Sequence, residues 1–250
     1  MKILCTNDDG IHARGIELLV GICETLADDV FVVAPDREQS ATSHSLTLYR
    51  PLRPTARGPR RWAVDGTPTD CVLLAHGALL PVRPDIVVSG VNHGPNMGED
   101  VLYSGTVAAA MEGLSLGIPA VALSFAGHDF DLLPTWREPL ANLLRSIFAH
   151  MPFPENTLLN VNLPPVPGSA AGGVRITTLG SRVYEESLQH MTDPWGRDLF
   201  WIGGGQIRWT GPATSDFQAI ADHYVSVTPL HLDLTHYGSL DPVRAWALTL

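Results

Sequence analysis

The sequence predicts an α/β protein with a Rossmann-like, three-layer α/β/α fold, a mostly parallel sheet and a C-terminal extension rich in β-hairpins. In the first part of the chain, short β-branched runs alternate with stretches that carry apolar residues at helical spacing. Strands that are separated by helices run parallel in one sheet. Beyond about residue 166, short strand-like runs are separated by glycines, as in hairpins. We therefore expect a core over residues 1–165 and a β-rich extension over 166–250, within one structural unit.

The first strand and helix frame two adjacent acids. Ile3–Cys5 is a short apolar run that ends just before Asp8 and Asp9, and the stretch Ile11–Leu26 has apolar residues on one helical face. Asp9 followed by glycine is also compatible with a plain turn, and either acid with a helix N-cap. Val30–Ala34 is a continuous β-branched and aromatic run, which suits a strand buried on both faces.

The middle of the chain continues the alternation. Short strands are expected around Leu46–Leu48 and Trp62–Val64, on either side of a segment, Arg50–Arg61, that holds five arginines. We interpret that segment as a solvated loop rather than an anion site. The remaining expected elements are helices at Pro68–Leu80, Gly105–Leu116 and Trp136–His150, and strands at Asp85–Ser89, Ala120–Phe125 and Leu158–Leu163.

The sequence of the extension predicts β-hairpins and one short helix. The expected strands are Val174–Thr178, Arg182–Tyr184, Leu199–Ile202, Gln206–Trp209 and Tyr224–Thr228, with a helical piece at Ala219–Ala221. Three tryptophans fall here: Trp195, Trp201 and Trp209. Large aromatic side chains on hairpins pack in a core or a subunit interface more often than they stack on a base, so we favour packing.

Composition excludes several classes of protein. The net charge of −10 disfavours binding to a nucleic-acid duplex or an anionic membrane, and no apolar run is long enough to span a bilayer. Lys2 is the only lysine, so a P-loop lysine and a pyridoxal phosphate Schiff base are excluded. We expect no signal peptide. The three cysteines have no paired spacing and two of them lie in apolar runs, which indicates buried free thiols in a reducing cytosol.

Polar side chains follow three predicted strands at the same edge of the sheet. Asp8 and Asp9 follow the first strand, Ser40 lies after the second, and Asn92 follows the strand at Asp85–Ser89. Ligands bind at this edge in open α/β sheets. Carboxylate, hydroxyl and amide oxygens are hard donors that suit magnesium, manganese or calcium, and such a site keeps positions open for water and a phosphate oxygen.

An anion site is predicted beside these acids. Ser104, Gly105 and Thr106 precede a helix that begins with small residues. A hydroxyl can cap the helix, the glycine admits a ligand to the backbone, and free N–H groups favour phosphate. On its own, this segment would indicate only a helix cap. Beside an acidic metal site, it indicates a centre for phosphoryl transfer. No dinucleotide fingerprint follows the first strand.

Three histidines fall in segments at this edge: His12, His44 and His93. None of the ten histidines has the spacing of a metal-binding pair, so none is a confident ligand. Each remains a candidate for substrate contact.

Five ordered motifs resemble the survival protein SurE family. They are Asn7–Gly10, Ala34–Ser40, Gly66–Cys71, Ser89–Asn96 and Tyr103–Gly113, and Val225–Leu230 matches the family's C-terminal part. The resemblance implies a metal-dependent 5′/3′-nucleotidase that hydrolyses nucleoside monophosphates, some members acting also on 3′-nucleotides or polyphosphate. Arg14 and Ala41 depart from the residues common in the family, proline and glycine.

The resemblance also assigns roles. It implies one divalent cation per subunit, magnesium or manganese, bound by Asp8, Asp9, Ser40 and Asn92, with the two acids catalytic. It implies that phosphate is held by Asn7, Asn96, Ser104, Gly105 and Thr106. It further implies a cytoplasmic homodimer or homotetramer whose C-terminal extension joins subunits.

Alternatives remain at this stage. Whether water attacks phosphorus directly, or Asp8 does so first to form an acyl phosphate, is open. A receiver-like signalling domain also has an acidic pair after its first strand, although the late lysine of such domains is absent here. A non-catalytic binder of metal and nucleotide is the other alternative.

Overall fold

A nine-stranded sheet forms the centre of the protein in a computed structural model that describes residues 1–184, 188–202, 207–246 and 248. The strand order is β3-β4-β2-β1-β5-β6-β7-β13-β8. The strands are β1 (Lys2–Thr6), β2 (Asp29–Pro35), β3 (Pro54–Gly58), β4 (Arg61–Val64), β5 (Ile86–His93), β6 (Ala120–Phe125), β7 (Leu158–Leu163), β8 (Val174–Ile176) and β13 (Val225–Leu230). All neighbouring pairs are parallel except β3 with β4 and β13 with β7.

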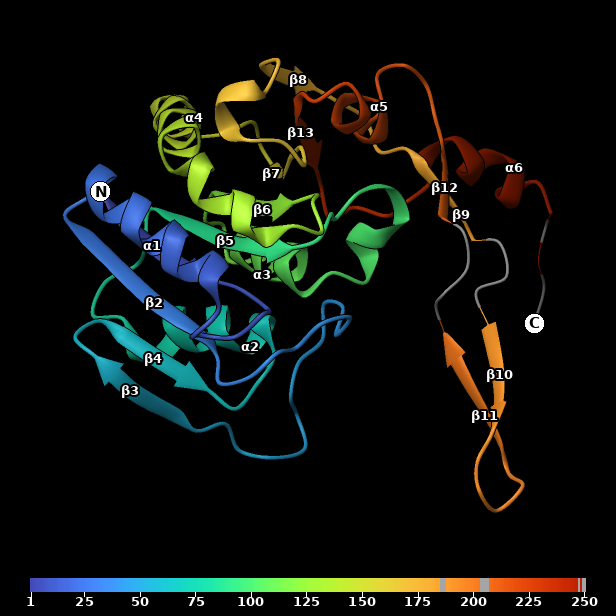
Figure 1. The fold of residues 1–250 in the computed structure, drawn as a ribbon, viewed down its shortest axis with the longest axis horizontal. Helices are drawn as coiled ribbons and strands as arrows, with labels where there is room; N and C mark the ends of the chain where they lie inside the picture. Colours follow the sequence, from blue (N-terminus) through green and yellow to red (C-terminus); the bar gives the residue numbers. More distant parts are fainter. Residues whose placement is uncertain (185–187, 203–206, 247, 249–250) are drawn as a thin grey trace.

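Helices cover both faces of this sheet, which confirms the predicted three-layer fold (Figure 1). The helices are α1 (Arg14–Leu26), α2 (Pro68–Leu74), α3 (Gly105–Ser115), α4 (Arg137–Ala149), α5 (Asp216–Ala221) and α6 (Leu240–Arg244). Side chains of β1 alternate between two cores: Ile3 packs with residues of α1 and α4, whereas Leu4 packs with residues of α2 and α3. This alternation is the period of two that strand geometry imposes.

Local sequence signals set the starts of two helices near the site. Thr67 caps α2 and exchanges hydrogen bonds with Asp70, while Pro68 occupies the first turn. Ser104 caps α3 by accepting a hydrogen bond from the N–H group of Val107. Both caps lie at the carboxyl edge of the parallel strands, so both helices begin where a ligand would bind.

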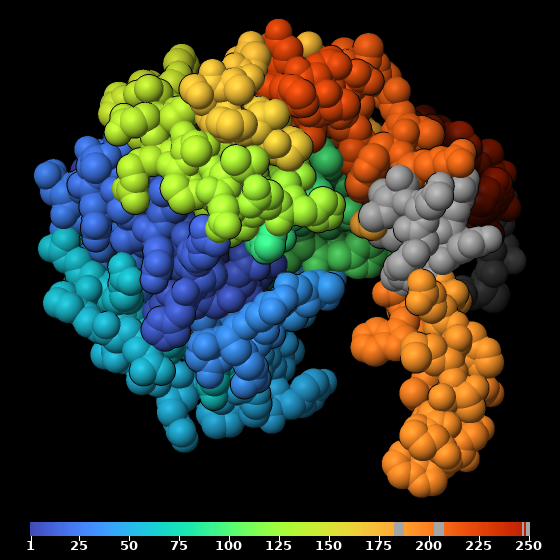
Figure 2. Space-filling view, in the orientation of Figure 1, coloured from blue at the N-terminus to red at the C-terminus, as the bar shows by residue number. Residues whose placement is uncertain are grey.

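Two two-stranded antiparallel sheets extend the C-terminal part. β9 (Ser181–Tyr184) pairs with β12 (Ile207–Thr210), and β10 (Leu188–Thr192) pairs with β11 (Asp198–Ile202). Figures 1 and 2 show the β10–β11 hairpin standing away from the body of the molecule. Hairpins were predicted for this region, although Gln206, the expected start of one strand, lies outside the described residues.

Some expected elements differ from those observed. Leu46–Leu48 forms no strand; instead β3 forms within the arginine-rich segment, which is largely exposed. This strand is tolerated there because it is an edge strand with proline at its first residue. The helix expected to reach Leu80 changes to a π-helical turn at Ala75–Leu79.

The tryptophans of the extension have different environments. Trp195 and Trp201 are exposed, so within this chain they do not pack in a core. Trp209 stacks on Phe217, with ring centroids 3.6 Å apart. Along the described stretches of chain, no helix has the length and apolar character needed to cross a membrane.

Candidate active site

Asn7, Asp8 and Asp9 form the turn that follows β1. Asn7 is buried, and its side-chain amide donates to the carbonyl of Gly10 (2.9 Å), closing the turn. Gly10 has a φ of 98°, which a glycine adopts without strain. Asp8 is 4% exposed, and Asp9 is half-buried. The turn therefore presents two neighbouring carboxylates at the carboxyl edge of the sheet.

The start of α3 packs directly on Asp8. The hydroxyl of Thr106 donates a hydrogen bond to Oδ1 of Asp8. A Cβ atom on Gly105 would lie 2.7 Å from Cβ of Asp8, so only glycine allows this approach. The Ser104–Gly105–Thr106 turn thus lies against Asp8, and the Thr106 hydroxyl is directed at the Asp8 carboxylate.

The end of β5 packs on Asp9. The backbone N–H of His93 donates to Oδ2 of Asp9 (3.2 Å). The side-chain amide of the preceding residue, Asn92, donates to the carbonyl of Gly94 (2.9 Å). Because the nitrogen of Asn92 is engaged, its oxygen remains as the atom that a cation would bind.

The segment after β2 is the third part of the site. The N–H of Gln39 donates to the carbonyl of Asp8 (2.7 Å), which places Ser40 next to the turn. Ser40 is exposed, and its hydroxyl donates to Oε1 of Glu38 (2.8 Å). Glu38 is therefore an additional carboxylate near the site that sequence reasoning missed.

Asn96 lies in a separate polar network. Its backbone N–H donates to Oδ1 of Asn162 (2.9 Å), and its side chain donates to Oγ of Ser124 (2.8 Å). The side-chain amides of Asn160 and Asn162 both donate to the carbonyl of Asn96. Among the described residues, the hydrogen bonds of Asn96 go to β6 and β7, and none goes to Asp8 or Asp9. In the sequence, the two asparagines at alternate positions of the buried strand β7, Asn160 and Asn162, could have indicated this network.

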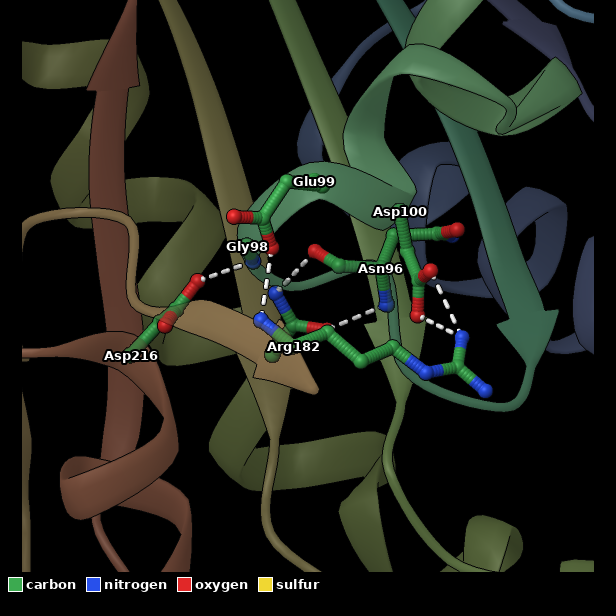
Figure 3. A network of polar contacts seen from close by, with 7 residues as sticks. Asn96, Gly98, Glu99, Asp100, Arg182 and Asp216 are labelled. Carbon is green, nitrogen blue, oxygen red and sulfur yellow. Dashed lines mark hydrogen bonds and ion pairs between the residues drawn. The ribbon is translucent and has the colours of Figure 1, made fainter. Parts of the chain in front are cut away.

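A second set of contacts ties the segment after Asn96 to the C-terminal extension (Figure 3). The guanidinium of Arg182 pairs with the carboxylate of Asp100, and its backbone N–H donates to Glu99 (2.6 Å). Asp216 accepts from the N–H groups of Gly98 and Gly180, each at 2.9 Å. The extension thus supports the loop that leads from β5 to α3.

Burial controls the ionisation of the two acids. Desolvation raises the pKa of Asp8 from 3.8 to about 6, the Thr106 hydrogen bond lowers it in part, and the charge of Asp9 raises it further. The pKa of Asp9 is also raised, mainly by burial. Among the described residues, no ion pair involves either carboxylate. Within the described residues no salt bridge therefore offsets the charge of the turn, although the charge of nearby His93 lowers the pKa of Asp9 in part.

The residues present suit a hard divalent cation. Two carboxylates share one turn, and the buried Oδ1 of Asn7 has no hydrogen-bond partner. Within the described part of the chain, no cluster of three or more His, Cys, Asp or Glu residues is placed to hold a metal. The oxygen donors of Asp8, Asp9, Ser40 and Asn92 match the preferences of magnesium or manganese rather than those of a closed zinc site.

Without metal, this protein should lose stability as the pH rises through the pKa of Asp8. The unfolded chain ionises Asp8 near 3.8 and the folded chain only near 6, so the contribution of Asp8 is full below about pH 4 and lost above about pH 6. The shift corresponds to at most about 3 kcal/mol. Thermal unfolding in EDTA should show Asp8→Asn more stable than wild type at pH 7.5, but not at pH 4. A stability difference that does not change with pH would contradict this prediction.

Comparisons with known proteins identify the family of this chain. A family model described as survival protein SurE matches residues 3–186. The chain is 61% identical to a "5'-nucleotidase SurE" of Gemmatimonas aurantiaca over 98% of both chains. It is 49% identical to the protein of the same name from Geobacter metallireducens, over 98% of this chain and 97% of that one.

Solved structures give the same result. The crystal structure of the SurE protein from Aquifex aeolicus is similar, with a TM-score of 0.84 and 38% identity over 99% of this chain and 100% of that chain. The match covers both the core and the C-terminal extension. The chain therefore belongs to the survival protein SurE family.

Proposed function

We propose that this protein is a 5′-nucleotidase, a phosphoric monoester hydrolase that converts nucleoside 5′-monophosphates to nucleoside and phosphate at the Asp8–Asp9 turn. The observation that carries the proposal is the contact between this acidic turn and the start of α3, made through Thr106 and Gly105. An acidic pair and an anion-binding helix start lie together, as phosphoryl transfer requires. The names of the curated relatives support the same reaction.

The cation would be held by Asp8, Asp9, Ser40 and Asn92, one per subunit, with magnesium or manganese as the ion. When bound, such an ion supplies Lewis-acid polarisation and lowers the pKa of a bound water. The donor set supports this assignment because it consists of carboxylate, hydroxyl and amide oxygens. For Ser40 to bind the ion, its hydroxyl must turn from Glu38, to which it donates in this structure.

Substrate phosphate would lie against the first turn of α3. The N–H groups of Gly105 and Thr106, together with the helix dipole, favour the charge of the phosphoryl oxygens, whereas the N–H of Ser104 donates to the carbonyl of Asp100 (3.1 Å). Asn7 and Asn96 are the further phosphate-binding residues in this proposal. Thr106 also orients Asp8 through its hydrogen bond, which keeps the carboxylate directed at the site.

We assign different roles to the two parts of the chain. Residues 1–165 form the catalytic core, and residues 166–250 form the extension, which we propose joins subunits of a cytoplasmic homodimer or homotetramer. The exposed aromatic side chains of the β10–β11 hairpin, Phe200 and Trp201 among them, support an interface there. The substrate is a small nucleotide, and the acidic protein binds neither a nucleic-acid duplex nor a membrane.

A phosphate-release screen tests the reaction. Nucleoside 5′- and 3′-monophosphates and a short polyphosphate would be incubated with the purified protein in magnesium, manganese or EDTA. We expect release from 5′-monophosphates that requires the divalent cation and stops in EDTA. Release that continues undiminished in EDTA, or no release from any nucleotide, would contradict the proposal.

A further inference from the structure

A cluster of three side chains is linked to Asp9 through the backbone of one of its residues. It consists of Arg14, His93 and Phe130, and we refer to it as the ledge. Arg14 is the first residue of α1, His93 is the last residue of β5, and Phe130 begins the 3-10 turn after β6. The hydrogen bond from the backbone of His93 to Asp9 joins the ledge to the candidate catalytic site.

The ledge is held together by stacked contacts. The rings of His93 and Phe130 lie with centroids 4.5 Å apart and an angle of 33° between their planes. The guanidinium carbon of Arg14 is 5.7 Å from the centroid of the Phe130 ring. The guanidinium of Arg14 also pairs with the exposed carboxylate of Asp131 (2.8 Å). Phe130 itself is anchored because its ring meets Phe125 of the core edge-on at 5.9 Å.

The outer surface of the ledge is open to a ligand. The side chain of Arg14 is 56% exposed, and His93 is exposed. Next to His93, a Cβ atom added to Gly94 would meet no atom within 4 Å. The Arg14 guanidinium and the His93 ring are therefore two flat groups that contact Phe130 and keep exposed surface, with open space at the neighbouring Gly94.

We propose that the ledge receives the base of the substrate nucleotide, through stacking on the exposed surfaces of Arg14 and His93. This inference rests on the proposed function, since it assigns the nucleoside end of the same substrate. Bases stack on aromatic rings and on arginine planes, and the contribution is sequence-tolerant because every base has a flat π face. The start of α3 contacts Asp8, and the backbone of His93 contacts Asp9. A nucleotide with its phosphate at the start of α3 and its reacting bond at Asp8–Asp9 can therefore direct its base toward the ledge.

The test compares two esters that differ only in the base. Adenosine 5′-monophosphate and ribose 5-phosphate carry the same primary phosphate, and only the first can stack. For Arg14→Ala and for His93→Ala we expect kcat/KM with adenosine 5′-monophosphate to fall about tenfold, mainly through KM. With ribose 5-phosphate, the change should stay below about twofold.

Arg60→Ala is the matched control. The guanidinium carbon of Arg60 lies 5.4 Å from the centroid of the Phe31 ring, and the residue pairs with Asp29 at 2.7 Å, so it has the same two contacts as Arg14. These contacts lie at the amino ends of β2 and β4, the opposite edge of the sheet from the site. Its loss should leave the ratio of the two substrates unchanged.

The outcomes separate the ledge from the proposed function. If wild type hydrolyses both esters and Arg14→Ala lowers both equally, the ledge is a structural tie between α1 and the turn after β6, and the inference is wrong. If wild type releases phosphate from neither ester, the proposed function itself is wrong. A selective loss for the nucleotide, absent in Arg60→Ala, supports the inference.

Discussion

Replacing Asp8 by asparagine is expected to lower kcat/KM for nucleoside 5′-monophosphates about a thousandfold while the protein keeps its fold. The amide occupies nearly the same volume as the carboxylate, so packing against Gly105 is preserved. What is lost is the negative charge that attracts the cation and that Thr106 orients. Initial rates with adenosine 5′-monophosphate, together with a far-UV circular dichroism spectrum, would measure both effects.

A remote carboxylate provides the comparison for this variant. Asp222 follows α5 and pairs with Arg175, far along the chain from the acidic turn. Asp222→Asn makes the same carboxyl-to-amide change and should leave kcat/KM within about twofold of wild type. Equal activity of Asp8→Asn and wild type would show that the acidic turn is not the catalytic centre.

Replacing Gly105 by alanine is expected to reduce kcat/KM about a hundredfold, since small displacements of catalytic groups have effects of this size. The added methyl would lie 2.7 Å from Cβ of Asp8 and 3.1 Å from Cγ of Pro68. To avoid these close contacts, Asp8 or the start of α3 must move, and either movement separates the carboxylate from the proposed phosphate site. Steady-state kinetics should show the loss chiefly in kcat.

Gly113→Ala distinguishes this effect from general overpacking of α3. A methyl there would lie 2.9 Å from Cγ2 of Val87, near the other end of the same helix. Both variants should lose stability by about 1–3 kcal/mol, as overpacked cores do. Only Gly105→Ala should lose activity beyond about tenfold. If both variants lose activity equally, the closeness of Gly105 to Asp8 has no special role.

Much of the fold follows from local patterns in the sequence. The run before Asp8 and the helical spacing after it predict β1 and α1, and Ser104 marks the start of α3 as its cap. Local sequence patterns do not predict a strand that forms only because it pairs with a neighbouring strand. β3 forms within an exposed, arginine-rich segment because β4 offers a free edge, which no property of Pro54–Gly58 itself indicates.

In the candidate site, too, some features follow from local sequence and others from long-range contacts. The turn at Asp8 and Asp9 is visible in the sequence because two acids end an apolar strand. The hydrogen bond from Thr106 to Asp8 joins residues 98 positions apart, so sequence spacing carries no sign of it. Asn160 and Asn162 could have been identified, because two amides on one face of a buried strand need partners.

Binding of the cation itself tests the central claim most directly. Wild type and Asp8→Asn would each be titrated with manganese by calorimetry, without nucleotide. Our account predicts one ion per wild-type chain and affinity at least about a hundredfold weaker in the variant. Manganese binding of equal affinity and stoichiometry in the two proteins would contradict the assignment of the Asp8–Asp9 turn as the metal centre.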